Sequence, residues 1–201
     1  MTSSKQTILS AIRRHHLPEA PLPSLKQSWI SFADAPKQFA SVLESVGGRA
    51  VSVPTLDAIN AELAKLPAWT EARKVVSLVS GFQPEPSNRV IDFNQLDDPH
   101  QTEDIDFAIL PGEFAVAENG AVWITDSGVK HRAIFFIAQQ LALVVSASNI
   151  VHNMHEAYER LSFDSPGFGA FISGPSKTAD IEQSLVVGAH GPRSLTVFIT
   201  A

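Results

Sequence analysis

The segment Lys74–Val79 constrains the fold more than any other part of the chain. Its sequence, KVVSLV, is apolar at nearly every position. A strand that faces water on one side alternates apolar and polar residues, whereas a nearly continuous apolar run indicates a strand covered on both faces. Such a strand belongs in a sheet with a layer packed on each side, so this run predicts a layered α/β domain.

Strand-like and helix-like segments alternate toward both ends of the chain, which favours the same architecture. Asp34 and Thr55 are each expected to cap a helix. Asn119-Gly120 separates two β-type runs within Phe114–Thr125 and predicts a hairpin. Further strands are predicted at 50–53, 106–110, 134–137, 141–145, 168–173 and 195–199, and further helices at 149–161 and 179–187. Together these elements predict a three-layer α/β/α sandwich with a mixed sheet.

The first residues are predicted to form a separate unit. Ser3 or Ser4 can cap a short helix, and the three prolines of Pro18–Pro23 are typical of a linker or arm. We therefore expect an N-terminal helix and proline-rich arm at residues 1–28, and a single compact domain at residues 29–201.

The composition excludes several classes of protein. The formal net charge is -6 and the pI is near 5.6, so neither nucleic acid nor an anionic membrane surface is an expected partner. No apolar run approaches the roughly 20 residues that span a bilayer. Residues 1–14 lack the apolar core of a secretory signal, so we expect a soluble, cytoplasmic protein without membrane insertion.

Cysteine is absent from the sequence. This excludes disulfides, cysteine-ligated zinc and an ordinary iron–sulfur cluster on this chain, and it leaves any cofactor unidentified. We also predict no metal site on the 149–161 helix, because its His and Glu side chains are expected to face solvent, opposite the apolar stripe: His152, His155, Glu156 and Glu159.

Residues 172–182 contain most of the chemistry that the sequence displays. A strand is expected to end in this segment, followed by a turn at Gly174-Pro175 and a helix from about Ala179. The hydroxyl and amine groups of Ser176–Thr178 crowd the start of that helix, where backbone N–H groups attract anions. A capped helix start needs no ligand, so a purely structural role is the alternative. Because a helix of about ten residues is ~15 Å long, His190 beyond it need not meet Ser176.

Two blocks of the sequence resemble the LUD family. GPSKTADIE at Gly174–Glu182, followed by GAHGP at Gly188–Pro192, is similar to the C-terminal motif of that family. AENGA at Ala117–Ala121, followed by Arg132, is similar to its hairpin motif. The resemblance extends from about Phe39 to the C-terminus. It implies the NagB/RpiA/CoA-transferase-like fold, and a role in oxidising L-lactate to pyruvate together with iron–sulfur partner subunits.

A candidate site is predicted between the hairpin and the Gly174–Thr178 loop. Glu118 is the first choice for a general base, and His190 is the alternative acid–base group. The remaining predicted residues would bind a small carboxylate or phosphate-like ligand: Gly120, Arg132, Gly174, Ser176, Lys177, Thr178 and Asp180. The alternatives are that Glu118 pairs with Arg132 and that His190 donates to backbone carbonyls.

Three functions are left open by the residues and the resemblance. The first is an enzymatic or ligand-binding subunit of lactate oxidation. The second is a non-catalytic assembly subunit whose two glycine-containing loops contact iron–sulfur partners. The third is a small-molecule transferase or isomerase that acts on a sugar phosphate or a CoA ester. The sequence does not decide whether this chain is itself an enzyme.

Overall fold

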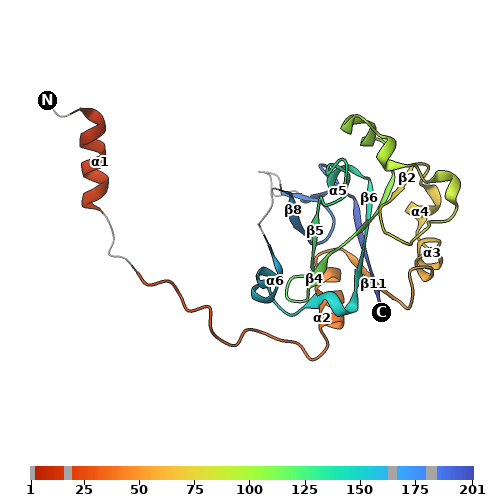
Figure 1. The fold of residues 1–201 in the computed structure, drawn as a ribbon, viewed down its shortest axis with the longest axis horizontal. Coiled ribbons are helices and arrows are strands. Elements are labelled where there is room, and N and C mark those ends of the chain that lie inside the picture. The colour runs from red at the N-terminus through yellow and green to blue at the C-terminus, as the bar shows by residue number, and fades with distance from the viewer. Residues whose placement is uncertain (1–2, 16–19, 163–166, 180–184) are drawn as a thin grey trace.

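The computed structural model describes residues 3–15, 20–162, 167–179 and 185–201. Figure 1 shows a layered body and, projecting from it, an N-terminal helix on an extended arm. The body is built around two sheets that lie in neighbouring layers.

The larger sheet has five strands in the order β1-β11-β6-β3-β2, and every neighbouring pair is parallel. These strands are β1 (Arg49–Val53), β2 (Val75–Ser77), β3 (Phe107–Pro111), β6 (Gln140–Ser146) and β11 (Ser194–Thr200). The apolar run that opened the sequence prediction is β2, which lies at one edge of this sheet.

Alternation along the strands divides the core into two clusters, one on each face of the sheet. In β6, Leu141, Leu143 and Val145 belong to the first cluster, and Ala142 and Val144 belong to the second. Helices α3 (Ala58–Leu63) and α4 (Pro67–Glu71) supply buried side chains to the second cluster.

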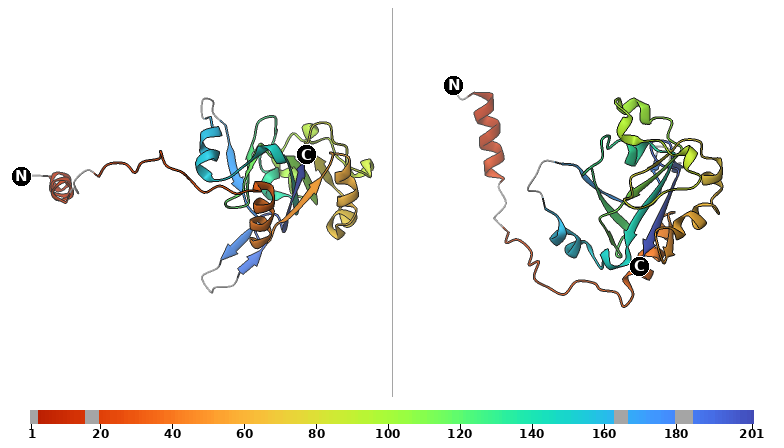
Figure 2. Two further views of the ribbon diagram at one scale, coloured as in Figure 1. Left: turned by 90° about the horizontal axis from the view of Figure 1, so that it is seen from below. Right: turned by 45° about the vertical axis from the view of Figure 1, so that its right-hand side comes forward.

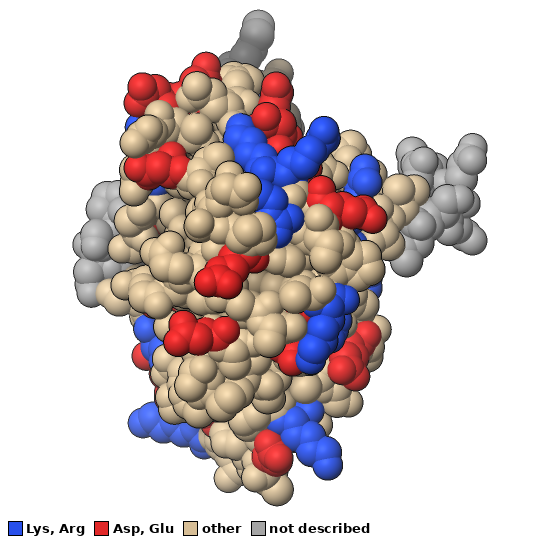
Figure 3. Space-filling view, turned by 90° about the vertical axis from the view of Figure 1, so that its right-hand side faces the viewer, with Lys and Arg blue, Asp and Glu red and all other residues tan. Residues whose placement is uncertain are grey.

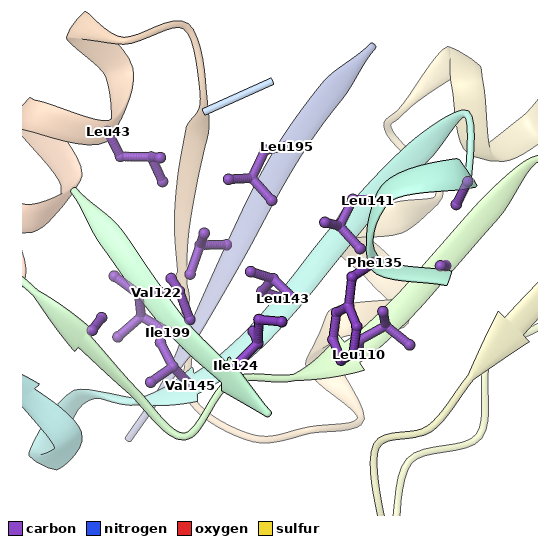
Figure 4. Close-up of a cluster of buried hydrophobic side chains, with 14 of the residues drawn as sticks. Leu43, Leu110, Val122, Ile124, Phe135, Leu141, Leu143, Val145, Leu195 and Ile199 are labelled. Carbon is purple, nitrogen blue, oxygen red and sulfur yellow. The ribbon is translucent and has the colours of Figure 1, made fainter. Parts of the chain in front are cut away.

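The first cluster is covered by two helices and the smaller sheet. The helices are α2 (Ala35–Ser45) and α5 (Ile134–Ile137). The smaller sheet has the order β7-β4-β5-β8, with strands β4 (Phe114–Val116), β5 (Ala121–Thr125), β7 (Ile150–Val151) and β8 (Gly169–Ile172). Figure 4 shows side chains from both sheets, α2 and α5 meeting in this cluster.

The α/β class and the three-layer arrangement agree with the prediction. The mixed pairing lies in the smaller sheet, where β4 pairs in parallel with β7 and antiparallel with β5 across the predicted Asn119-Gly120 turn. The predicted cap of α2 is present, since the Asp34 side chain accepts a hydrogen bond from the backbone N–H of Lys37. Four 3-10 turns complete the fold: Ser87–Arg89, Phe93–Gln95, Pro99–Thr102 and Ala147–Asn149.

Two local predictions are wrong. Residues 134–137 form the helical turn α5 rather than a strand, with Phe135 buried and Phe136 directed outward. The helix predicted from residue 149 begins only at Met154. Residues 150–151 form β7, and Asn153 caps α6 (Met154–Arg160). Short apolar runs suit a strand and a helix equally. Residues 150–151 became a strand by pairing with β4, whereas 134–137 pair with no described strand and form a helical turn.

The helix predicted at 179–187 is also wrong where the structure describes it. β9 (Lys177–Ala179) and β10 (Leu185–Val187) form a two-stranded antiparallel hairpin, in which Lys177 pairs with Val187 and Thr178 with Val186. Figure 2 shows this hairpin projecting from the body. The anion site at a helix start, which the sequence suggested for Ser176–Thr178, is therefore not present in that form.

The N-terminal unit begins with α1 (Ser4–Arg14), whose first turn is stabilised by a capping box between Ser3 and Gln6. Residues 20–33 then run without helix or strand to the start of α2. No helix among the described residues has both the length and the apolar character needed to cross a bilayer. On the face drawn in Figure 3, acidic and basic side chains are interspersed rather than gathered into one basic tract.

Candidate functional site

The β9–β10 hairpin brings the two glycine-containing loops together. The backbone N–H of Gly188 donates to the carbonyl of Ser176 at 2.9 Å, and the N–H of Ser176 donates to the carbonyl of Pro192 at 2.9 Å. Because the hairpin reverses the chain, Ser176 lies at its base beside the loop that contains His190. A helix in the same place would have separated these two loops by its full length.

A cavity of about 210 Å³ opens at this junction. Ser176 and His190 supply its polar side chains. Gly174, Gly191 and their prolines supply backbone, and the rest of the lining is apolar: Phe135, Phe136, Leu141, Phe171 and Ile172. This lining suits a small molecule with one polar or anionic end and a short apolar substituent.

The backbone around His190 adds hydrogen-bond donors to the same wall. The N–H groups of His190 and Gly191, which both line the cavity, donate to no other residue that the structure describes. Successive backbone N–H groups in a bend form a concave site that favours an anion. In this structure the unpartnered donors of the segment belong to a loop rather than to a helix start.

Two glycines are required by close approaches at this junction. Gly174 has φ +75°, and a Cβ there would lie 2.7 Å from the carbonyl oxygen of Val46 at the end of α2. A Cβ on Gly191 would lie 2.9 Å from Cβ and 3.0 Å from Oγ of Ser176. Gly174 therefore allows its turn to pack against the end of α2, and Gly191 leaves room for the Ser176 side chain.

The structure places Glu118 and Arg132 elsewhere. Oε2 of Glu118 accepts the backbone N–H of Met154 at 2.9 Å, which places it at the start of α6. Arg132 lies 3.8 Å from Asp126 and stacks over the ring of Phe168. Neither lines the cavity, and the alternative pairing of Glu118 with Arg132 is not formed.

The hairpin motif contacts the segment before the Gly174-Pro175 turn through its backbone, not through the Glu118 side chain. The Ser173 hydroxyl donates to the carbonyl of Asn119 at 2.9 Å. Gly120 has φ +64°, and a Cβ there would lie 2.8 Å from the backbone nitrogen of Leu43. Gly120 therefore faces α2 rather than the cavity.

Three other predicted residues lie outside the cavity wall or outside the described chain. Lys177 is exposed on β9, with its side chain beside Gly47. Thr178 is half-buried in the hairpin. Asp180 is not among the described residues. Of the predicted site residues, Gly174, Ser176 and His190 are thus the ones that meet at this cavity.

The sequence prediction did not include the aromatic wall. Phe136 and Phe171 line the cavity, but the first was assigned to a strand and the second to a core strand. Gly191 lay within the quoted motif and was not chosen. Its position between a histidine and a proline was the one sequence signal that could have indicated a place in the site.

The face with two His and two Glu is less solvated than expected. His155 stacks on Trp29 with ring centroids 3.4 Å apart, and Nδ1 of His152 accepts the backbone N–H of Phe32 at 3.1 Å. These two histidines therefore fix the N-terminal arm to the body at Trp29 and Phe32. Among the residues described, no group of three or more His, Cys, Asp or Glu is placed to hold a metal ion.

Comparison with known proteins gives a family match and a set of similar curated proteins. The LUD domain matches residues 87–200, which is more than half of the chain and includes the cavity. Lactate utilization protein C 1 of Bacillus mycoides (strain KBAB4) is 37% identical over 106 residues, covering 45% of this chain and 44% of that protein. Lactate utilization protein C of Shouchella clausii (strain KSM-K16) is 36% identical over 97 residues, covering 46% of this chain and 42% of that protein. The chain thus spans about half the length of the curated relatives it matches.

A solved structure supports the fold. The crystal structure of a DUF162 family protein from Deinococcus radiodurans superposes with a TM-score of 0.58 at 19% identity, covering 84% of this chain and 98% of that one. At this identity the likeness concerns the fold alone. The family match over residues 87–200 and the agreement of fold lead to one conclusion: this chain belongs to the LUD domain family.

Proposed function

We propose that this chain acts in lactate utilisation, in the oxidation of L-lactate to pyruvate, and that its cavity binds the small carboxylate. The observation behind this proposal is the junction at one cavity of Ser176, His190 and the N–H groups of residues 190–191, which have no partner among the described residues, within the segment that matches the family. The names of the relatives in Bacillus mycoides and Shouchella clausii suggest the pathway.

The cavity offers what a 2-hydroxy acid or 2-oxo acid needs. The N–H groups and the Ser176 hydroxyl donate to the carboxylate, and the apolar side chains receive the methyl group. His190 stands beside the same space, where an imidazole can accept or return the proton of a substrate hydroxyl. Oxidation also breaks the Cα–H bond as the C=O bond forms, so that a second proton passes to solvent and two electrons are removed. Because the sequence contains no cysteine, we propose that iron–sulfur partner subunits receive them.

Purified protein is expected to be stabilised by L-lactate or pyruvate. A ligand at about ten times its dissociation constant adds about 1.4 kcal/mol to the free energy of unfolding. For a chain of this size, this amounts to a rise of roughly 3–6 °C in Tm. Thermal unfolding with each ligand, and with acetate for comparison, measures the effect.

Two variants and one control locate the binding. Ser176→Ala and His190→Ala are each expected to remove most of the shift. His100→Ala changes an exposed histidine that does not line the cavity and is expected to keep the full shift. A shift that survives both cavity variants would contradict the site. Loss of the gene without loss of growth on L-lactate would contradict the pathway.

A second candidate function, assembly without catalysis, is favoured by one observation. Val186 and Val187 on the projecting hairpin are about half exposed, which is unusual for neighbouring aliphatic side chains. Val186→Ser with Val187→Ser is expected to reduce co-purification with the iron–sulfur partners by tenfold or more, while the ligand-induced Tm shift persists. Unchanged co-purification would remove the hairpin from the interface.

A further inference from the structure

Among the described residues, exposed large apolar side chains gather in two regions, and Tyr158 on α6 is exposed apart from them. Six lie in the N-terminal unit: Ile8, Leu9, Ile12, Leu22, Leu25 and Ile30. Four lie on α5 and β10: Phe136, Ile137, Val186 and Val187, of which Phe136 and Ile137 line one groove of the body. Each set leaves apolar area in water that contact with the other would remove.

Helix α1 is built as a helix but packs against nothing in the described chain. Its capping box is complete, yet Ile8 is 59% and Ile12 61% exposed, and none of its residues is buried. A helix of 11 residues is marginal in water on its own, so its stability depends on a partner surface. Its charged residues are all basic (Lys5, Arg13 and Arg14), although the whole chain has a net charge of -6.

The arm behind α1 is fixed to the body at one point. Trp29 stacks on His155, the backbone N–H of Phe32 donates to His152, and Nδ2 of Asn153 donates to the carbonyl of Ile30 at 2.9 Å. This contact ties residues 29–32 to the β7–α6 region. Residues 20–28 beyond it are exposed.

From this contact the arm leads away from the body. Figures 1 and 2 show α1 standing clear of the sheets in every view. The described part of the arm contains Pro21 and Pro23, and proline favours extended, semi-rigid chain. Because no residue of α1 is buried, its apolar side chains are open to contact with another molecule.

The body offers a groove of matching character. It has a volume of about 580 Å³ and is lined by Ala133, Phe136, Ile137 and Gln139 on one side and by the backbone of Gly188–Gly191 on the other. The lining is mainly apolar and, because of its glycines, leaves room for the close approach of a helix.

An acidic segment flanks this groove. Residues 92–106 contain six Asp and Glu and no Lys or Arg. The backbone N–H groups of Gln139 and Gln140 donate to the carbonyls of Ile105 and Asp106, so the end of this segment adjoins the groove at Gln139. Asp97 and Asp104 are ion-paired with Lys130 and Lys74, which lowers the pKa of both carboxyls and offsets their charge. The other four acidic side chains of the segment form no ion pair with a described Lys or Arg.

We propose that α1 of one molecule lies in the groove of a second copy of this chain, and that the two copies exchange their helices. Ile8, Leu9 and Ile12 contact Phe136 and Ile137 of the second copy, and the basic residues of α1 face its acidic segment. Exchange of identical elements about a two-fold axis closes the assembly at a dimer. The groove shares Phe136, His190 and Gly191 with the candidate cavity, so the docked helix covers the mouth of that cavity.

The absence of native cysteine allows a clean cross-linking test. A tagged Ile12→Cys chain and an untagged Ile137→Cys chain are mixed and oxidised, and covalent heterodimer is expected as the main product. A disulfide requires Cα atoms within about 7 Å, so it reports contact rather than proximity. The matched control pairs Ile12→Cys with Tyr158→Cys on α6. Tyr158 is more exposed than Ile137, at 61% against 37%, but does not line the groove, so this pair is expected to give only background.

Light scattering gives an independent measurement. The full chain is expected to have the mass of a dimer, and Ile8→Asp with Ile12→Asp the mass of a monomer. Because α1 packs against nothing in its own body, this variant leaves the body folded, as an unchanged Tm of the main transition would verify. A monomeric full chain would overturn the proposal. So would a chain with both cysteines that closes its disulfide within one molecule. Neither result bears on whether the cavity binds a carboxylate.

Discussion

Phe135→Ala is expected to destabilise the folded chain by about 3–5 kcal/mol, the largest effect of any change considered for this protein. Phe135 is 1% exposed and lies in the first core cluster, against side chains from both sheets. Its removal leaves a cavity that the surrounding strands fill only in part, since each strand is fixed by pairing on its neighbours.

The neighbouring Phe136 provides the matched control. It has the same side chain on the same short helix, but it is 42% exposed. Phe136→Ala is expected to change the free energy of unfolding by less than about 1 kcal/mol. Urea unfolding of both variants measures the difference, and at this chain length the gap corresponds to roughly 10 °C in Tm. Equal losses for the two variants would mean that α5 does not turn Phe135 inward and Phe136 outward.

Gly120→Ala is expected to have the second-largest effect, a destabilisation of about 2–5 kcal/mol. Two causes add at this position. The φ of +64° is strained for alanine, and the added Cβ would approach the backbone nitrogen of Leu43 to 2.8 Å. Backbone within a packed helix cannot yield as a side-chain end can, so α2 must shift.

Gly128→Ala separates the two causes. Gly128 also has a positive φ, +72°, but a Cβ there would meet nothing within 4 Å. It is therefore expected to lose only about 1–2 kcal/mol, from the backbone conformation alone. Thermal or urea unfolding of the pair isolates the contact with α2. If the two variants lost the same stability, Gly120 would have no packing role and its assignment to ligand binding would regain support.

Local patterns predicted most of the framework. The apolar run of β2, the helix that begins at Asp34 and the Asn119-Gly120 hairpin each depend on residues close together in the sequence. Strand order does not, because β11 pairs between β1 and β6 through contacts that no local pattern encodes. The likeness to the NagB/RpiA fold, implied by resemblance, stays a prediction.

The segment after Ser176 shows why local reasoning fails. Asp180 and Glu182 suit the first turn of a helix, and this favoured a helical interpretation. Thr178, Val186 and Val187, however, are β-branched, and they pair across the hairpin in the structure. A helix from Ala179 would have carried the chain away from Ser176, whereas the hairpin brings it back beside Ser176.

Because the hairpin was not predicted, the candidate site was predicted only in part. Ser176 and His190 were chosen separately and were not expected to meet, yet the hairpin places both at one cavity. Glu118 was chosen for its motif, and the structure directs it to the N–H groups at the start of α6. Motifs identified the loops, but only the topology showed which of their side chains share a space.

Helix α2 connects the two motif blocks in a way that sequence comparison can test. Its last turns lie against Gly120 at Leu43 and against Gly174 at Val46, so one rigid element sets the spacing between the blocks. An evolutionary change in the bulk of either helix residue alters the room at a motif glycine. Positions 43 and 46 should consequently covary with 120 and 174 across homologous chains, more strongly than with the residues of the cavity wall.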